Sequence, residues 1–500
     1  MTADPLEIVL TTSGRVRGLV VDGVIRHRAV PYAAPPAGRL RFAPAAPAPR
    51  WDGVRDATGI GATAPQHARR FPGVDMTPLL PDADWAGGHD YLTVNVWAPA
   101  RRDQPLPVMV YLHGGAFVAG SGDCPAFDGA AFARSGVVLM TINYRLGIEG
   151  FAVLDDAPRN LGLRDQIAAL AWVRDNAAGF GGDPGNVTVF GESAGAMSIA
   201  TLLVSGAVDG LCDRAIVQSG HDELVRDPAV GRRLTEQIAA AAGAPATAAG
   251  LRSVPVAELL DAQRSVLARP LDSSEGGWDP AYQQAAFAPV VDGEVVRSAS
   301  DRGMSSIPLL IGTTRAEMNL YAESSADLDT LSEDGAVARL AASRPDARRV
   351  LSGYGLGQAG RDPGRVLVDA LTDLMFRSPS RRFALRHGGP VFAYEFEWES
   401  PLFDGRLGAC HGLDLPFVFD NLGAASGRHA LCGAEPPAQL AAAMNERWIR
   451  FATTGDPGWP QYDDRRLLMR FGGGFAPQWS RVGVDSAPLE ASPLPARLMR

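Results

Sequence analysis

Short apolar runs separated by loops and helix-like stretches dominate the chain from about residue 107 onward. Residues 107–112 and 137–142 are nearly continuous in apolar and β-branched side chains. Such runs are typical of strands that are buried on both faces. Three further runs of this kind are expected to form strands, at residues 215–218, 308–311 and 391–396.

Helical periodicity lies between two of these runs. Leu163, Ile167 and Leu170 recur at the spacing of one face of a helix. We therefore expect an amphipathic helix over 163–178, ended by Gly181. Strands that alternate with helices predict an α/β fold whose large, mostly parallel sheet is covered by helices on both faces.

The two ends and the insertions of this pattern differ from its middle. Residues 1–60 alternate short β-type runs with glycines, which predicts an N-terminal, β-rich antiparallel region. Residues 221–300 and 320–390 are mostly helix-like and rich in alanine, and we expect them to cap the sheet. No repeat or low-complexity linker divides the chain, so we interpret residues 1–500 as a single elaborated domain.

The segment around Ser193 carries the strongest chemical signal. Residues 187–190 read as a buried strand, and they run through Gly191-Glu192-Ser193-Ala194-Gly195 into an apolar, helix-like stretch. A Gly-x-Ser-x-Gly sequence between a strand and a helix is typical of the nucleophile elbow of an α/β-hydrolase. The serine hydroxyl is then exposed above the sheet, and glycines flank it because larger side chains would collide. The pattern predicts acyl transfer to Ser193 and then to water.

A glycine-rich loop upstream supplies candidate donors for the oxyanion. Residues 113–117 read His-Gly-Gly-Ala-Phe and follow the strand that ends at Leu112. Bare backbone allows N–H groups to approach a substrate oxygen closely. Together with the N–H of Ala194, at the start of the helix after the elbow, this loop offers up to three donors.

The order of residues in the chain narrows the choice of the base. In this fold the triad runs serine, then Asp or Glu, then histidine. Four of the eight histidines follow Ser193, namely His221, His387, His411 and His429. The late, glycine-containing loop around His411 favours that residue, but order alone does not exclude the other three.

The carboxylate is less sharply indicated. Glu317 comes a few residues after the strand 308–311, and sites of doubly wound sheets lie beyond the carboxyl ends of strands. Asp292 and Glu323 are alternatives to Glu317 for this role. Most single acidic residues are solvated surface charges, so position alone does not decide among the three.

Composition excludes several classes of function. The chain has 47 basic and 56 acidic residues, a net charge of −9, so no cationic surface for nucleic acid or an anionic membrane is expected. No apolar stretch is long enough to span a bilayer, and the N-terminus has no secretory signal pattern. Metal and cofactor motifs are missing, so we expect a small-molecule substrate and no cofactor.

Four cysteines bear on the compartment. Cys124, Cys212, Cys410 and Cys432 are widely spaced and form no Cys-x-x-Cys pair. Free, buried thiols in a reducing cytosol are therefore expected, and with them a cytoplasmic bacterial protein.

Taken together, the motifs resemble the type-B carboxylesterase family, which includes cholinesterases and bacterial p-nitrobenzyl-type esterases. The resemblance covers most of the chain and keeps the motifs in order. It includes residues 31–36, 92–97, 113–117, 143–147, 160–166, 180–184, 191–195, 218–220, 289–293 and 448–457.

The resemblance assigns the acid and the base. The catalytic glutamate of the family falls on Glu317 and its histidine on His411. A buried anion beside the nucleophile falls on Glu192, and a hydroxyl close to the triad falls on Ser219.

Further assignments concern the oxyanion hole. Its donors fall on Gly115, Ala116 and Ala194, and Gly114 shapes the turn. The resemblance also implies that Arg145 and Asp165 form a buried structural ion pair.

One departure from the family pattern concerns a disulfide. Secreted relatives close a loop at the active-site gorge with two cysteines that would fall on Ala64 and Tyr91. Both cysteines are missing, which agrees with a reducing compartment. It also predicts a more mobile loop 67–90.

These observations predict a serine carboxylic-ester hydrolase that acts through an acyl-enzyme on uncharged esters of short to medium chain. The alternatives are an amide or carbamate hydrolase with the same triad, or an inactive scaffold or adhesion protein of the same fold. Because the base must be neutral, activity is expected to fall below about pH 6.5. The apolar residues proposed for the pocket walls are Phe117, Trp85, Phe376, Leu413 and Phe417.

Overall fold

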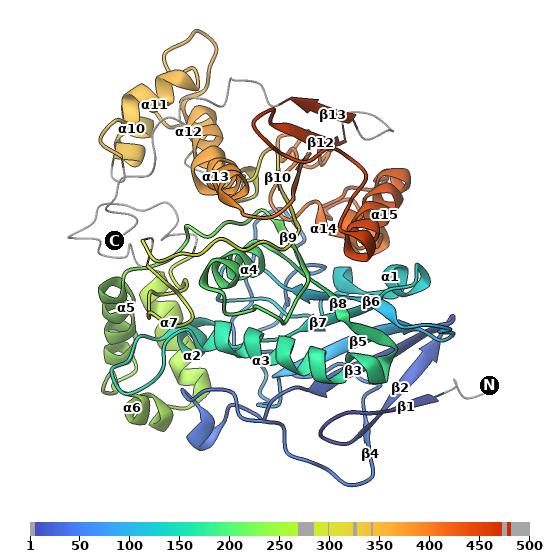
Figure 1. The fold of residues 1–500 in the computed structure, drawn as a ribbon. Helices are drawn as coiled ribbons and strands as arrows, with labels where there is room; N and C mark the ends of the chain where they lie inside the picture. The colour runs from blue at the N-terminus through green and yellow to red at the C-terminus, as the bar shows by residue number, and fades with distance from the viewer. Residues whose placement is uncertain are drawn as a thin grey trace.

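The computed structural model of the protein describes residues 6–268, 285–298, 300–323, 328–341, 344–472 and 478–481. A single twisted sheet runs through it (Figure 1). Its strands are β1 (Leu6–Leu10), β2 (Arg15–Val21), β3 (Val24–Pro31), β4 (Val54–Asp56), β5 (Thr93–Pro99), β6 (Leu106–Leu112), β7 (Val138–Ile142), β8 (Gly182–Glu192), β9 (Arg214–Gln218), β10 (Leu309–Thr314), β11 (Val391–Phe396), β12 (Leu467–Phe471) and β13 (Gln478–Arg481).

The strand order is β1-β2-β3-β5-β7-β6-β8-β9-β10-β11-β12-β13, and β4 pairs with β2. From β7 to β12 every neighbouring pair is parallel. The pairs from β1 to β7 and the pair β12–β13 are antiparallel. The α/β fold and the antiparallel N-terminal region predicted from the sequence are therefore present, and parallel pairing is confined mainly to the middle of the sheet.

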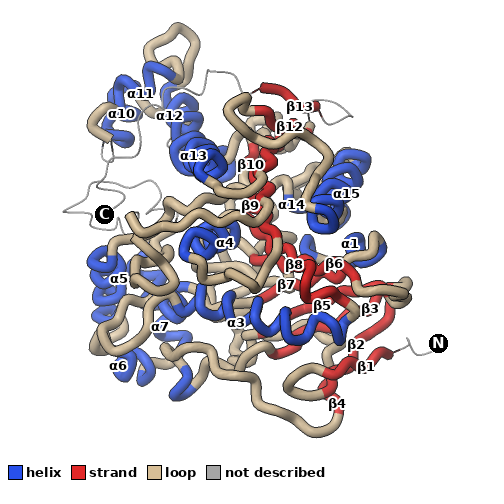
Figure 2. The backbone as a smooth tube through the Cα atoms, in the orientation of Figure 1, coloured by secondary structure: helices blue, strands red, loops and turns tan. Residues whose placement is uncertain are grey.

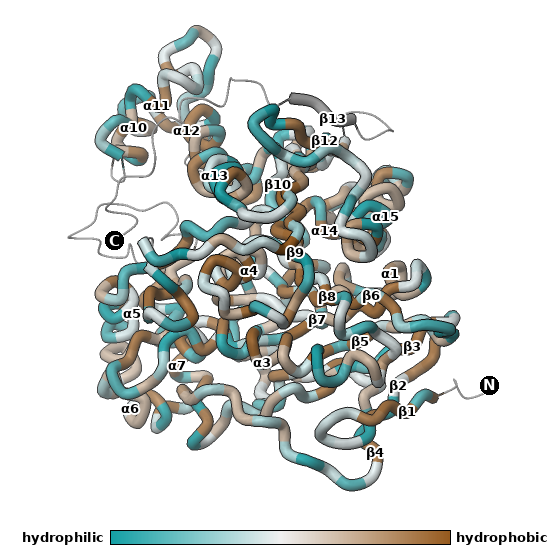
Figure 3. The backbone as a smooth tube through the Cα atoms, in the orientation of Figure 1, coloured by the Kyte–Doolittle hydropathy of each residue, from teal (hydrophilic) through white to brown (hydrophobic). Residues whose placement is uncertain are grey.

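Two hydrophobic cores lie on opposite faces of this sheet. Successive side chains of a strand point to opposite faces, and in β6 they alternate between the two cores: Val108 and Val110 belong to one, Met109 and Tyr111 to the other. Strands β6 and β7 are accordingly apolar over most of their length, as is the second half of β8, whereas β8 begins with the partly exposed residues 183–186 (Figure 3). This explains why the sequence shows continuous apolar runs there instead of alternation.

Helices cover both faces (Figure 2). Helices α3 (Leu161–Asn176) and α4 (Ala194–Ser205) contribute to the first core, and α1 (Ala130–Arg134), α14 (Leu415–Val418) and α15 (Ala438–Thr454) to the second. The helix predicted over 163–178 is α3. The remaining helices are α2 (Gly147–Phe151), α5 (Pro228–Ala241), α6 (Ala248–Ser253), α7 (Val256–Leu267), α9 (Asn319–Ala322), α10 (Glu333–Ala341), α11 (Ala347–Gly353), α12 (Pro363–Thr372) and α13 (Ser378–Arg386).

The expected helical insertions are helical only in part. In 221–300, α5 to α7 are helical, but residues 285–298 form loops and the isolated bridge of Val290 with Arg226. Parts of both insertions (269–284, 299, 324–327 and 342–343) lie outside the described residues. In 320–390 the helices α9 to α13 are present, with a π-helical turn at Asp373–Arg377 between α12 and α13.

No helix in the described ranges is both long enough and apolar enough to cross a bilayer. The four cysteines are free and buried, as predicted. Arg145 and Asp165 form an ion pair at 2.6 Å with both side chains fully buried.

Candidate active site

Ser193 lies at the sharp turn between β8 and α4. Its backbone has φ 54° and ψ −122°, a combination that a residue with a side chain rarely adopts. A Cβ added to Gly195 would lie 2.0 Å from the carbonyl oxygen of Leu112, and one added to Gly191 would lie 2.7 Å from the same oxygen. Both glycines are therefore needed for the end of β6 to pack directly against this turn.

The loop after β6 approaches Ser193 from the other side. Gly115, Ala116 and Phe117 all have positive φ, at 107°, 56° and 61°. A Cβ on Gly114 would lie 3.1 Å from Cβ of Ser193, and one on Gly115 would lie 2.0 Å from the carbonyl oxygen of Ala119. The two glycines thus allow the loop to curl tightly beside the serine.

Backbone donors converge on the same place. Gly115, Ala116 and Ser193 line one pocket, and Ala194 is the first residue of α4. Within the described part of the chain, the N–H groups of Ala116 and Ala194 donate no hydrogen bond. Free N–H groups at the start of a helix attract a negatively charged oxygen. The arrangement can therefore stabilise an oxyanion that forms next to Ser193.

Glu317 and His411 are in direct contact. Nδ1 of His411 lies 2.6 Å from Oε2 of Glu317. The other oxygen of this fully buried carboxylate accepts hydrogen bonds from the Ser219 hydroxyl at 2.6 Å and the Thr314 N–H at 2.8 Å. Four lone-pair sites of the carboxylate are thus largely occupied, and the imidazole is held in one orientation with Nε2 turned toward the pocket.

The alternatives that sequence order left open lie elsewhere. Asp292 binds Asn160 and caps a turn through three backbone N–H groups. Glu323 pairs with Arg365 and Arg406. The ring nitrogens of His221 and His387 contact backbone carbonyl oxygens, of Met375 and Ile307 respectively.

Glu192 is the other ionisable group beside the imidazole. Its Oε1 lies 3.1 Å from Nε2 of His411. Burial, with the nearby carboxylates of Asp414 and Glu317, raises the pKa of Glu192 to about 8. Burial disfavours the imidazolium of His411, but interactions with Tyr321, Glu192 and Glu317 outweigh it and raise the pKa of His411 well above 6.5. Glu192 and His411 therefore compete for one proton.

The pocket at Ser193 is lined by the predicted residues Gly114, Gly115, Ala116, Glu192, Ser193 and His411, and by ten residues that the sequence did not single out. Loop residues form one wall, and residues after β10 and after His411 form the other. The lining residues are Arg69, Phe71, Met76, Leu79, Leu80, Gly114, Gly115, Ala116, Phe127, Glu192, Ser193, Leu320, Tyr321, His411, Gly412 and Leu415.

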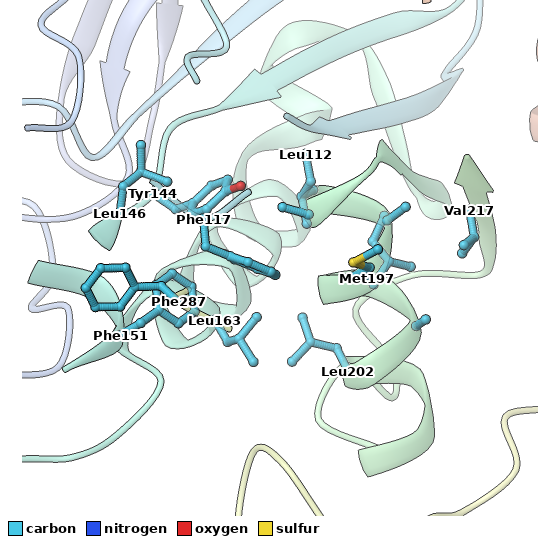
Figure 4. Packing of buried hydrophobic residues seen from close by; sticks show 14 of the residues in the cluster. Leu112, Phe117, Tyr144, Leu146, Phe151, Leu163, Met197, Leu202, Val217 and Phe287 are labelled. Carbon is cyan, nitrogen blue, oxygen red and sulfur yellow. The ribbon is translucent and has the colours of Figure 1, made fainter. Parts of the chain in front are cut away.

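None of the five residues predicted as pocket walls is among them. Phe117 is fully buried and packs against Phe151 in the first core (Figure 4). Leu413 and Phe417 are fully buried in the second core. Phe117 has a positive φ and Phe417 lies in α14, and the side chains of all three residues belong to the cores instead of the pocket lining.

The other two, Trp85 and Phe376, are also outside the lining of the pocket. Trp85 packs against His89, with ring centroids 5.7 Å apart. Phe376, in the π-helical turn, packs against the imidazole of His411 at 4.7 Å, where it supports the ring without lining the pocket.

The loop 67–90 is closed by hydrogen bonds where secreted relatives have the disulfide. The buried Gln66 side chain bonds the carbonyl oxygens of Ala64 and Gly120 and accepts from the Gly120 N–H at 2.7 Å. Trp85 N–H donates to the Gln66 carbonyl oxygen at 2.9 Å. Among the described residues, no group of three or more His, Cys, Asp or Glu could hold a metal ion.

Comparison with known proteins gives one consistent result. The model of the carboxylesterase family matches residues 5–486. A para-nitrobenzyl esterase of Bacillus subtilis is 36% identical over 479 residues, which cover 92% of this chain and 93% of that protein. A phenmedipham hydrolase of Pseudarthrobacter oxydans is 35% identical and covers 92% and 94%. The crystal structure of a carboxylesterase of Geobacillus stearothermophilus superposes with a TM-score of 0.80 at 33% identity, covering 96% of this chain and 99% of that one.

Proposed function

The chain belongs to the carboxylesterase family, and from this premise we propose that it hydrolyses carboxylic esters with Ser193 as nucleophile, His411 as base and Glu317 as the residue that orients the base. The observation that carries the proposal is the contact of His411 with the buried, fully bonded Glu317 at the pocket that also contains Ser193.

In the first half of the cycle, Nε2 of His411 takes the proton of the Ser193 hydroxyl as its oxygen attacks the ester carbonyl carbon. The carbonyl oxygen becomes an anion that accepts hydrogen bonds from the N–H groups of Gly115, Ala116 and Ala194. His411 then protonates the departing alcohol, which leaves the acyl group on Ser193.

In the second half, water attacks the acyl-enzyme. His411 takes a proton from this water and returns it to the Ser193 oxygen as the acid leaves. The imidazolium that forms in each half is stabilised by the carboxylate of Glu317 at Nδ1. Glu192, 3.1 Å from Nε2, adds to this stabilisation while it is ionised.

The walls support esters of short to medium chain. Phe71, Met76, Leu79 and Leu80 present apolar side chains to one side of the pocket. Such walls favour uncharged groups wherever the substrate touches them. Arg69 is the exception, since it is a cationic side chain in this otherwise apolar wall.

We propose that residues 1–500 work as a single domain, because one sheet carries the elbow, the donor loop and the strand before Glu317. The four unpaired cysteines support a reducing, cytoplasmic location.

The test is covalent labelling combined with turnover. Wild-type protein is expected to react with a fluorophosphonate at Ser193 and to hydrolyse p-nitrophenyl acetate. Ser193→Ala is expected to lose labelling and to lose roughly a millionfold in kcat, the loss seen when one member of a serine-protease triad is removed. Ser205→Ala is the matched control, because Ser205 lies at the far end of α4 and its hydroxyl bonds, among the described residues, the Leu202 carbonyl oxygen and the Ala207 N–H.

If the wild-type protein neither reacts with the fluorophosphonate nor hydrolyses the ester, the result would instead support a scaffold role. An amide such as p-nitroacetanilide, and phenmedipham because a relative hydrolyses it, belong in the same panel. Faster turnover of either than of the simple ester would replace the ester proposal.

A further inference from the structure

Arg69 is a cation in the wall of an otherwise mostly apolar pocket. It lies in the loop 67–90 and is half-buried. Its guanidinium carbon lies 5.2 Å from the ring centroid of Phe71 and 5.7 Å from that of Tyr321. Contacts with two aromatic faces restrict the guanidinium to a narrow region while leaving its N–H groups unused.

Within the described part of the chain, no carboxylate lies within 4.0 Å of the Arg69 guanidinium, and none accepts a hydrogen bond from it. The outer hollow that Arg69 shares with the pocket is also lined by Arg70 and by the two acidic residues Asp75 and Asp82. The carboxylate of Asp75 accepts a hydrogen bond from the Thr77 N–H at 3.0 Å, and the exposed Arg70 donates to the backbone carbonyl oxygen of Asp82 at 3.1 Å.

Arg69 is also close to the reacting groups. The ring of Tyr321, which it contacts on one side, lies 5.8 Å from the imidazole of His411, centroid to centroid. Arg69 therefore stands one aromatic ring away from the proposed base, in the pocket that contains Ser193. A group on an ester bound at Ser193 can reach the guanidinium without leaving this pocket.

Taking the ester hydrolysis proposed above as given, we propose that Arg69 binds an anionic group of the substrate. The preferred substrates are esters with an apolar body and a carboxylate, or a comparable anion, away from the ester bond. A guanidinium binds a carboxylate through two parallel hydrogen bonds. The chain has a net charge of −9 and repels anions at long range, so an anionic ester needs such a local cation.

The anion can stand on the acyl or on the alcohol side of the ester, and matched substrate pairs separate these positions. On the acyl side, the mono-p-nitrophenyl ester of adipic acid is compared with p-nitrophenyl hexanoate. On the alcohol side, 4-acetoxybenzoate is compared with methyl 4-acetoxybenzoate. In each pair the second compound lacks the negative charge.

The variants are Arg69→Gln and, as the matched control, Arg70→Gln, which makes the same change of charge at the next position. In Arg69→Gln we expect kcat/KM for the anionic member of one pair to fall about 10- to 100-fold, the range for a charged hydrogen bond. The neutral member is expected to change less than about threefold, and Arg70→Gln to leave both unchanged within the same limit. Selective loss in the adipate pair puts the anion on the acyl side, and selective loss in the benzoate pair puts it on the alcohol side.

Equal losses for anionic and neutral esters, or no loss for either anion, would overturn the proposal. The neutral esters keep this result distinct from failure of the hydrolase proposal, in which wild-type protein hydrolyses no ester at all. Wild-type protein gives an independent measurement if Arg69→Gln folds poorly. With the wild-type protein, kcat/KM for the anionic member of at least one pair should exceed that for its neutral partner, and a lower kcat/KM for the anionic member of both pairs would also overturn the proposal.

Discussion

The floor of the pocket and the wall formed by the loop 67–90 are built in different ways. On the floor, Glu317 is fully buried and receives three hydrogen bonds from three separate segments. On the wall, Arg69 packs against two aromatic rings. The loop itself is held by the hydrogen bonds of Gln66 and by apolar residues that pack in the second core, namely Phe71, Val74, Met76, Leu79 and Leu80. The proposed catalytic residues thus lie just after the ends of strands, where several contacts fix the position of each side chain. Selectivity resides on half-buried polar positions of a loop, such as Arg69, which can change with little effect on the core.

The largest effect expected beyond loss of the nucleophile comes from the floor. Glu317→Gln keeps the size of the side chain, but the amide N–H of the glutamine can donate to Nδ1 of His411. The ring proton is then on Nε2, which can no longer accept the proton of Ser193. We expect kcat for p-nitrophenyl acetate to fall about 10⁴-fold, as for the equivalent change in a serine protease. Circular dichroism should show an intact fold. A loss below about tenfold would mean that the floor is no more constrained than the wall.

The pH dependence tests the electrostatics of the floor. His411 must be neutral to accept a proton, and its pKa is raised above 6.5, so it stays protonated to a higher pH than an ordinary histidine. We therefore expect kcat/KM, followed in a pH-stat, to begin falling above pH 6.5 as the pH is lowered, and to drop about tenfold per unit below the pKa. This places the fall higher than the unperturbed histidine value implies.

Glu192→Gln sharpens this measurement. The carboxylate of Glu192, 3.1 Å from Nε2, favours the imidazolium form of His411. Its removal should therefore lower the pKa of His411, and the fall of kcat/KM should move to lower pH. If kcat/KM of Glu192→Gln falls at the same pH as that of the wild type, Glu192 carries the shared proton and is neutral in this pH range, which its raised pKa of about 8 permits.

The smallest effect on kcat/KM is expected for a substitution in the loop 67–90 at a residue other than Arg69. Trp85 packs against His89 and is not among the residues that line the pocket. Trp85→Ala should change kcat/KM for p-nitrophenyl acetate less than about threefold, although it removes a large side chain from the loop. A loss as large as that of Glu317→Gln would erase the distinction between wall and floor.

The sequence predicts the floor better than the wall for a physical reason. The turn at Ser193 and the loop at Gly114 require glycines at fixed positions because a Cβ there would meet backbone atoms, so local sequence reveals them. Strands such as β6 are recognisable because both of their faces are buried.

The wall depends on which side of the chain faces the pocket, and apolar character alone does not determine it. Phe71 and Leu79 pack in the second core and also line the pocket. Phe117, Leu413 and Phe417 are as hydrophobic but lie wholly within the cores. Arg69 could have been suspected only as a charge in a loop with aromatic neighbours, a pattern that fits most solvated surface arginines. The loops at 285–298 escaped prediction similarly, because alanine-rich composition does not distinguish a helix from a packed loop.

The amide of Gln66 gives the attachment of the loop 67–90 a property that a sulfur bridge would not. It bonds Gly120, close to the donor loop, in both directions. Thiol reductants therefore have no bond to cut at this point, and dithiothreitol should leave both rate and substrate preference unaltered. Replacing Gln66 by Leu, by contrast, would leave the buried N–H and carbonyl oxygen of Gly120 without these hydrogen bonds and weaken the attachment of the loop 67–90.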